Sequence, residues 1–382
     1  MTPPGRVLVV TNDFPPRPGG IQTFVYELVR RLPAQQVVVF ASSWRDCASF
    51  DAQQDFPVIR HPGRVLLPTP DVRRQAGRVF DEVGATAVLF GAAAPLGLLG
   101  PSLRARGAVR TVALTHGHEA GWAQVPGARR LLRRIGDGVD TVTYLGEYTR
   151  RRIARALSEP AAARMVRLTP GVDAEIFRPD PERGLALRAR HGLTGRPVVV
   201  CVSRLMPRKG QDTLLAAWPT VRQRVPGAAL LLVGGGPYRG RLESSADRLG
   251  LGGDVVLTGS VSARDLPGYF TAGDVFAMPC RTRNRGLDVE GLGIVYLEAS
   301  ASGLPVVAGD SGGAPDAVLP DRTGYVVPGG DPSAVAERIV TLLTDPPLAR
   351  RLGDAGRRWV LDTWGWDRQA QTLQALLGLG AP

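Results

Sequence analysis

Pro197-Val-Val-Val-Cys-Val202 is an uninterrupted apolar run, and it leads directly into the polar loop Ser203-Arg-Leu-Met-Pro-Arg-Lys-Gly-Gln211. A continuous run of this kind is typical of a buried strand in a parallel sheet. Open parallel sheets bind ligands beyond the carboxyl ends of their strands. The stretch therefore predicts a core strand with a candidate ligand-binding loop at its end.

Similar apolar runs alternate with helical patterns along the rest of the chain. The first run is Arg6-Val-Leu-Val-Val-Thr11, and apolar residues then recur at helical spacing between positions 21 and 32. Further strands are predicted at 36–40, 87–90, 109–114, 141–144, 229–233, 254–257, 275–278, 305–308 and 324–327. Repeated βα units predict an α/β fold of two doubly wound, Rossmann-like parallel-sheet domains, which we expect to face each other across a cleft.

A turn-rich segment separates the two series of strands. It begins with Pro170-Gly-Val-Asp-Ala-Glu-Ile-Phe-Arg-Pro179, and the chain of 382 residues is long for a single hydrophobic core. We predict an N-terminal domain over 1–169, a connection over 170–196 and a second domain over 197–363. A helical pattern over about 364–380 is predicted to pack back on the first domain, and capping of the second domain is the alternative.

Composition narrows the class of protein. The cysteines, Cys47, Cys201 and Cys280, lack the spacing of a disulfide framework or a zinc site. Neither a signal-peptide pattern nor the ~20 uninterrupted apolar residues of a membrane span is present, so we expect a cytoplasmic protein. The net charge of +12 is concentrated in residues 1–170, which carry 23 arginines and 13 acidic residues. This excess predicts an anionic partner such as a membrane surface, a phospholipid or nucleic acid, and a general gain in solubility is the alternative.

Lys209 is the one lysine among 47 basic residues. A lysine provides a compact charge on a flexible stem, whereas arginine provides a rigid planar fork, and the two are not equivalent at a tight anion site. We predict that Lys209 and Arg204 bind a phosphate or diphosphate. Chance survival of one lysine on a solvated loop is the alternative.

Two glutamates, Glu290 and Glu298, flank the start of a helix predicted over about 293–302. Backbone N–H groups at the start of a helix favour an anion, and carboxylates hydrogen-bond sugar hydroxyls. We therefore interpret Glu290 as a ligand of a transferred sugar and Glu298 as a ligand of a nucleotide ribose; a capping and a surface glutamate are the alternative. The amides predicted to contact the diphosphate are those of Gly291, Leu292, Gly293 and Ile294.

The loop Thr115-His-Gly-His-Glu119 follows another predicted strand. It offers too few partners for a metal ion, and no metal site is predicted. We interpret His118 as a residue that contacts a sugar or handles a proton, with Glu119 orienting it. A histidine that only stabilises a turn is the alternative.

Three glycine-containing loops complete the set of candidate motifs. Gly19 and Gly20 precede a helix and allow a ligand to approach the backbone, although the pattern of a dinucleotide-binding loop is incomplete and a tight turn is the alternative. The loops Gly234-Gly-Gly-Pro237 and Thr258-Gly-Ser-Val261 both end strands of the second series. Backbone groups near Val261 are predicted to contact a base edge.

A basic helical pattern lies in the arginine-rich half of the chain. Arg129-Arg-Leu-Leu-Arg-Arg-Ile135 combines apolar and basic residues as expected for a helix on an anionic membrane surface. The candidate membrane and acceptor residues are Arg129, Arg130, Arg133 and Arg134. The alternative is a helix whose leucine and isoleucine side packs on its own core.

Taken in order, these motifs resemble those of retaining family-4 glycosyltransferases of the GT-B fold. The similarity is greatest to actinobacterial GDP-mannose-dependent phosphatidylinositol monomannoside mannosyltransferases, and its anchors are Asn12–Arg17, Gly19–Gln22, Thr115–Glu119, Pro170–Asp173, Ser203–Gly210, Gly259 and Arg283–Glu298. Other acceptors within family 4, and more remotely a basic nucleic-acid-binding protein, stay open as alternatives. Few aromatic residues accompany the basic ones, so no nucleic-acid partner is expected.

The resemblance implies a role for each candidate residue. Arg204 and Lys209 would neutralise the donor diphosphate, Glu290 would bind mannose, Glu298 ribose and Val261 guanine, while His118 would contact the sugar near the reacting carbon. It further implies a GDP-mannose donor, no cofactor or catalytic metal, and a phosphatidylinositol mannoside acceptor on the first domain. Peripheral association with the cytoplasmic face of the plasma membrane follows from that acceptor. For the transfer itself we expect retention through same-face attack.

Overall fold

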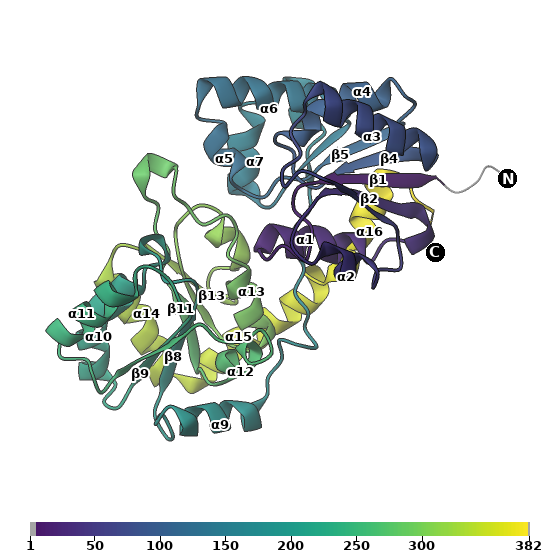
Figure 1. The fold of residues 1–382 in the computed structure, drawn as a ribbon. Coiled ribbons are helices and arrows are strands. Elements are labelled where there is room, and N and C mark those ends of the chain that lie inside the picture. Colours follow the sequence, from purple (N-terminus) through teal and green to yellow (C-terminus); the bar gives the residue numbers. More distant parts are fainter. Residues whose placement is uncertain (1–4, 381–382) are drawn as a thin grey trace. The chain divides into compact units, whose positions relative to one another are not determined.

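The computed structural model describes residues 5–380, which form two compact units (Figure 1). The first unit contains the chain up to Gly171 and again from Trp366 onwards, and the second contains Val172–Gly365. The second unit is thus inserted into the sequence of the first. Each unit is built on its own parallel sheet, as the alternating pattern predicts.

The first unit has a seven-stranded parallel sheet in the order β3-β2-β1-β4-β5-β6-β7. Its strands are β1 (Arg6–Thr11), β2 (Val37–Ser42), β3 (Val58–His61), β4 (Ala85–Phe90), β5 (Arg110–Ala113), β6 (Thr141–Tyr144) and β7 (Val166–Arg167). The apolar run Val7–Val10 is completely buried at the centre. A strand covered on both faces needs this continuous apolar sequence.

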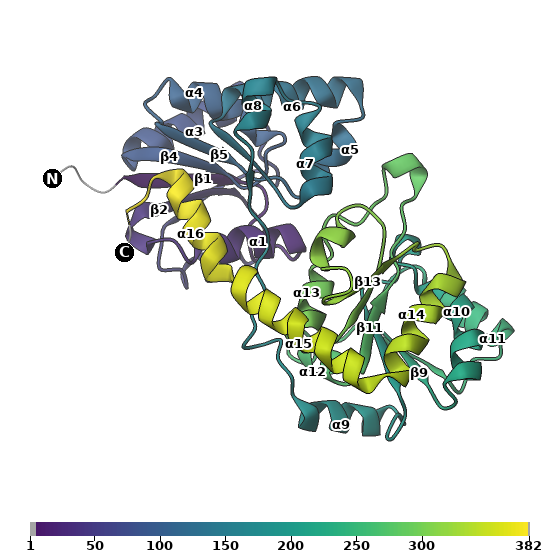
Figure 2. The same cartoon turned by 180° about the vertical axis from the view of Figure 1, so that it is seen from behind.

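Helices cover both faces of the first sheet. They are α1 (Gly20–Val29), α2 (Cys47–Asp51), α3 (Pro70–Glu82), α4 (Gly100–Arg104), α5 (Glu119–Trp122), α6 (Pro126–Gly138), α7 (Glu147–Ala154), α8 (Glu159–Ala163) and α16 (Trp366–Leu377), with 3-10 turns η1 (Ala34–Gln36) and η2 (Leu96–Leu99). Helices α1 and α16 lie on one face and α3, α4 and α6 on the other (Figure 2). Arg31 Nε lies 3.1 Å from Asp367 Oδ1, which ties α16 to the end of α1.

The second unit has a six-stranded parallel sheet in the order β10-β9-β8-β11-β12-β13. Its strands are β8 (Val198–Val202), β9 (Ala229–Val233), β10 (Val255–Gly259), β11 (Val275–Met278), β12 (Val306–Gly309) and β13 (Gly324–Val327). Strand β8 comes from the apolar run that opens the second series, and it occupies the middle of the sheet. The loop after β8 therefore starts beside the ends of both β9 and β11.

The helices of the second unit fill the intervals between these strands. They are α9 (Pro181–Arg190), α10 (Gln211–Arg224), α11 (Arg239–Arg248), α12 (Leu266–Thr271), α13 (Ile294–Ala301), α14 (Pro332–Thr344) and α15 (Pro346–Thr363), with 3-10 turns η3 (Pro207–Lys209), η4 (Asn284–Gly286) and η5 (Ala314–Ala317). The structure assigns residues 172–196 to this unit, whereas the sequence interpretation placed all of 170–196 in a connection. Helix α9 was missed because Gly184 is its one fully buried residue.

Candidate functional site

The loop after β8 is held against the end of β11 by a glycine. Gly210 has a φ of 76°, in the left-handed region, and a Cβ atom there would lie 1.9 Å from the carbonyl oxygen of Pro279. No other residue fits both the conformation and the space. The turn η3, which ends at Lys209, is thereby fixed next to the loop that leads from β11 to α13.

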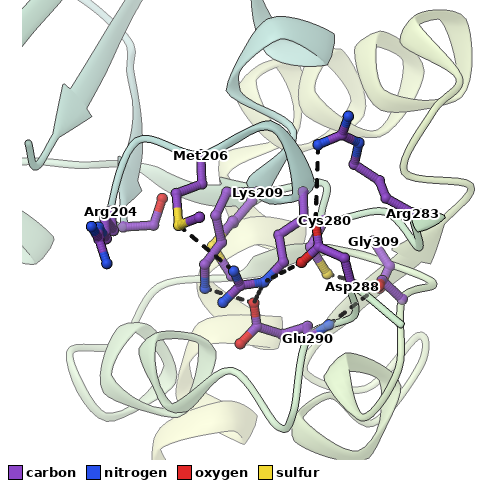
Figure 3. Close-up of polar contacts among 12 residues, drawn as sticks. Arg204, Met206, Lys209, Cys280, Arg283, Asp288, Glu290 and Gly309 are labelled. Atoms are coloured by element: carbon purple, nitrogen blue, oxygen red, sulfur yellow. Dashed lines mark hydrogen bonds and ion pairs between the residues drawn. The ribbon is translucent and has the colours of Figure 1, made fainter. Parts of the chain in front are cut away.

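Lys209 and Glu290 form a buried ion pair. Lys209 Nζ donates to Glu290 Oε2 over 2.6 Å, and the two side chains are only 11% and 9% exposed (Figure 3). Charges removed from water in this way are maintained only when they are paired. The structure thus brings together two residues that sequence analysis chose from separate motifs.

Three further charges extend this pair into a charge cluster of Arg208, Lys209, Arg283, Asp288 and Glu290. Arg208 Nε lies 3.9 Å from Glu290 Oε2 and 3.7 Å from Asp288 Oδ1. Arg283 Nη1 lies 3.9 Å from Asp288 Oδ2, and the same two residues form an antiparallel backbone bridge. Arg208 and Asp288 were not predicted from the sequence, although each lies within two positions of a predicted site residue.

The start of α13 presents unpaired amides, as predicted. Gly293 caps the helix with a φ of 80°, and within residues 5–380 the N–H groups of Gly291, Leu292, Gly293 and Ile294 have no hydrogen-bond acceptor. The preceding loop is fixed because Gly313 N–H donates to the carbonyl of Glu290 over 2.8 Å. Free N–H groups and the helix dipole together favour an anion at this position.

Glu298 lies on α13 about one turn after its start. Its side chain is half-buried, and no described residue donates a hydrogen bond to its carboxylate. Burial raises the pKa of Glu298 from 4.5 to about 7. A carboxyl group in this condition gains from a hydroxyl ligand that supplies the missing hydrogen bond.

A pocket of about 530 Å³ opens at the carboxyl ends of β8, β9 and β10. Its lining residues are Val202, Ser203, Arg204, Val233, Gly234, Gly235, Gly236, Ser260, Val261 and Leu266. Two residues predicted for the donor site, Arg204 and Val261, therefore share one cavity. Arg204 is exposed, and its guanidinium group has no partner within the described chain; Figure 3 shows it apart from the charge cluster.

Asp212 links the loops on either side of this site. Arg281 donates to both carboxylate oxygens of Asp212, over 2.8 and 2.6 Å, and Tyr238 Oη donates to Oδ2 over 3.0 Å. Burial opposes ionisation of Asp212, but its bonds to Arg281 outweigh burial and lower the pKa of this carboxyl. Tyr238 follows the Gly234–Gly236 loop, and Arg281 begins the loop that leads toward Glu290. The Asp212 carboxylate therefore positions both loops.

The histidine loop lies in the first unit, between β5 and α5. His118 is exposed, and its Nε2 lies 3.4 Å from Oε1 of Glu119, whose side chain is completely buried. The other carboxylate oxygen of Glu119 accepts from the backbone N–H of His116 over 2.9 Å. Burial lowers the pKa of His116, whose Nε2 lies 2.6 Å from the carbonyl of Gly91. Glu119 is therefore placed to orient His118, while His116 stabilises the loop.

The remaining candidates also lie in the first unit. Gly19 caps α1 with a φ of 153°, and the space around the Cα of Gly20 is open. In α6, Leu132 and Ile135 are buried, so the apolar side of this helix packs on its own core, as the alternative interpretation held. The candidate arginines Arg129, Arg130, Arg133 and Arg134 are all exposed. Arg129 also donates to the backbone carbonyl of Arg155 over 2.8 Å. Leu131 and Val125 are exposed beside the four arginines.

Residues 5–380 contain neither a metal-binding cluster nor a membrane-spanning helix. No group of three or more histidine, cysteine, aspartate or glutamate side chains is arranged to hold a metal ion. No helix in this part of the chain has both the length and the apolar character required to cross a bilayer.

Comparison with known proteins gives consistent matches. The family model for glycosyl transferases group 1 matches residues 186–359, and the model for glycosyltransferase family 4 matches residues 18–176. Among solved structures, Anabaena HepE in complex with UDP is similar with a TM-score of 0.81 at 19% identity, covering 98% of this chain and 99% of that one. Sucrose-phosphate synthase from Thermosynechococcus elongatus has a TM-score of 0.75 at 24% identity, covering 97% and 98%. These structures support the two-domain GT-B fold.

Sequence relatives are much more similar. The GDP-mannose-dependent alpha-(1-6)-phosphatidylinositol monomannoside mannosyltransferases of Mycolicibacterium smegmatis and Mycobacterium tuberculosis are 51% identical, over 97% of this chain and 98% of theirs. A relative from Corynebacterium glutamicum, named for the monoacylated acceptor, is 44% identical over 97% of both chains. Because these matches extend over nearly the whole length, the chain belongs to the family-4 glycosyltransferases, within the group that contains the phosphatidylinositol monomannoside mannosyltransferases.

Proposed function

We propose that this enzyme transfers mannose from GDP-mannose to a phosphatidylinositol monomannoside through an alpha-(1-6) linkage. The single observation that carries the proposal is the 51% identity, over almost the full length, to relatives named for this reaction. The donor-site residues predicted from sequence add support, because Lys209 and Glu290 are in contact and Arg204 and Val261 line one pocket.

The proposed donor site divides the nucleotide sugar among the features of the second unit. Guanine would lie in the pocket near Val261, and the ribose hydroxyls would donate to Glu298. The diphosphate would be bound by Arg204, by Lys209 and by the free amides of 291–294. Both cations of the cluster that face Glu290 approach its Oε2, so Oε1 is left to accept from mannose hydroxyls.

The proposed chemistry retains the anomeric configuration. The bond from the anomeric carbon to the diphosphate oxygen breaks, while the acceptor hydroxyl oxygen bonds to that carbon on the same face. The hydroxyl proton passes to the departing phosphate. Negative charge grows on the diphosphate as the bond breaks, so Lys209 and Arg204 stabilise the transition state more than the ground state. We propose His118 as a contact of the reacting sugar, oriented by Glu119, and no cofactor is invoked.

The acceptor is an anionic phospholipid, and we propose that the first unit binds it at the cytoplasmic face of the plasma membrane. The four exposed arginines of α6, with Leu131 and Val125 beside them, combine charge and apolar surface. Such a surface binds anionic lipid interfaces both by electrostatic attraction and by burial of apolar side chains. The helix would lie on the membrane surface and not cross it.

Incubation of the pure enzyme with GDP-mannose and defined phosphatidylinositol monomannoside vesicles tests the proposal. Mass spectrometry should detect a product heavier by one hexose, and linkage analysis should show an alpha-(1-6) linkage. A hexose transferred only to soluble inositol derivatives would favour a different acceptor. Transfer from UDP-sugars but not from GDP-mannose would overturn the proposed donor.

A further inference from the structure

Two cations lie near the same carboxylate oxygen of Glu290, and only one of them donates a hydrogen bond to it. Lys209 donates to Oε2 over 2.6 Å, whereas Arg208 Nε stands 3.9 Å from that atom. Arg208 Nε is buried, and no described residue accepts a hydrogen bond from it. A buried N–H without an acceptor is costly, so its position next to a carboxylate requires an explanation.

The proposed donor site places two demands on Lys209. In the structure its ammonium group neutralises Glu290, but in the proposed function the same group binds the donor diphosphate. When Lys209 turns to the diphosphate, a carboxylate whose side chain is 9% exposed loses its partner. Leaving a buried charge unpaired is strongly unfavourable, and it would oppose donor binding directly.

We propose that Arg208 is the positioning residue that takes over Glu290 when Lys209 engages the diphosphate. Its Nε–H then donates a hydrogen bond to Glu290 Oε2. For this bond to form, the present distance of 3.9 Å between the two atoms must shorten. This inference rests on the proposed function, because the movement of Lys209 toward the donor diphosphate is part of that function. Arg208 acts on the reaction through Glu290 and without touching the donor.

The surroundings of Arg208 suit this role. Asp288 Oδ1 lies 3.7 Å from the same Nε and holds the guanidinium near Glu290, and Arg283 in turn pairs with Asp288 (Figure 3). The backbone is fixed as well, because Arg281 N–H donates to the carbonyl of Arg208 over 2.8 Å. An arginine keeps its charge at every working pH, so it supplies a permanent counter-ion while the flexible lysine moves.

A double-mutant cycle on GDP binding tests this assignment. Calorimetry on the full-length chain compares wild type, Arg208→Gln, Glu290→Gln and the double variant. In the wild-type background Arg208→Gln should weaken GDP binding about tenfold, because Glu290 then retains Lys209. In the Glu290→Gln background, where position 290 carries no charge, the same change should alter affinity by less than about twofold.

Conservative and remote variants complete the design. Arg208→Lys keeps the charge and should stay within about threefold of wild type. Arg222→Gln removes an arginine that pairs with Asp254 outside the charge cluster, and it should leave GDP binding unchanged. If thermal unfolding shows that Arg208→Gln does not fold, Asp288→Asn replaces it in the cycle with the same expectations, because it removes the group that holds Arg208.

Three outcomes would overturn the assignment. Equal losses in both backgrounds would mean that Arg208 contacts the donor directly. No loss in either background would leave Arg208 without a role in binding. Absence of GDP binding by the wild-type protein would remove the proposed function and this inference with it, a result distinct from the first two, in which the wild-type protein binds GDP normally.

Discussion

Lys209 Nζ lies 2.6 Å from Oε2 of Glu290, 81 positions away in the chain. The contact unites the loop after β8 with the loop before α13, because Gly210 allows the first to lie against the end of β11. Each residue supplies the main counter-charge of the other. Changes at either position should therefore affect both the stability of the second unit and the proposed reaction.

Removal of the proposed diphosphate ligands should slow transfer. We expect Lys209→Ala and Arg204→Ala each to lower kcat/KM for GDP-mannose by about 10²-fold, because each removes positive charge from the leaving group. Initial rates with vesicle-borne acceptor measure the effect. Arg222→Ala is the matched control and should retain wild-type rates; wild-type kinetics in either test variant would remove that residue from the site.

The buried pair should show coupling in the free energy of unfolding. Glu290→Gln leaves the buried Lys209 ammonium without its main partner, and we expect it to destabilise the fold by about 3 kcal/mol. Lys209→Met should cost less, because Arg208 can then pair with Glu290. The double variant should be less destabilised than the two single effects combined, by at least about 1 kcal/mol. Urea unfolding of the four proteins gives these values. Strict additivity would show that the two charges do not interact.

Glu298 should make stability depend on pH. Its pKa is about 7 in the folded protein and near 4.5 when unfolded, so between these values the folded state binds more protons. The folded state therefore loses stability as pH rises from about 4.5 to 7, by at most about 3 kcal/mol because the group is partly solvated. Glu298→Gln should abolish this slope. A wild-type minus variant difference that stays constant from pH 5 to 8 would contradict the prediction.

The basic surface of α6 should govern membrane binding. A variant with Arg129, Arg130, Arg133 and Arg134 all changed to Gln should bind anionic phosphatidylinositol vesicles at least about tenfold more weakly, since each basic residue contributes about 1 kcal/mol near such a surface. Vesicle co-sedimentation measures the loss. The control variant changes four exposed arginines of the second unit, Arg222, Arg224, Arg248 and Arg350. Equal binding by both variants would indicate a general charge effect.

Most of the fold follows from continuous apolar runs, because a buried parallel strand must be apolar on both faces. The prediction failed where that demand is relaxed. Strand β3 is half-buried and includes Arg60 and His61, so it offers no apolar run, and β7 has only two residues. Helix α9 escaped notice because solvent covers most of its surface.

The candidate site residues could be proposed from the sequence because they follow strand ends, where parallel sheets bring loops together. Their pairing could not, since the contact between Lys209 and Glu290 depends on how two distant loops pack. The role of Arg208 was hidden for a related reason. In the sequence it is one arginine among 46, and it is distinguished only by the burial of its Nε and by the distance from that atom to Glu290.

The chain leaves the first unit at Gly171 and returns to it at Trp366, and the N–H of Val172 donates to the carbonyl of Trp364 over 2.7 Å. This hydrogen bond thus holds the two ends of the inserted second unit together. A polypeptide truncated after Gly365 would lose α16 from the first unit and uncover its neighbours on β4, β5 and α1. Shortening this enzyme at its carboxyl end would consequently damage the half that lies earliest in the gene.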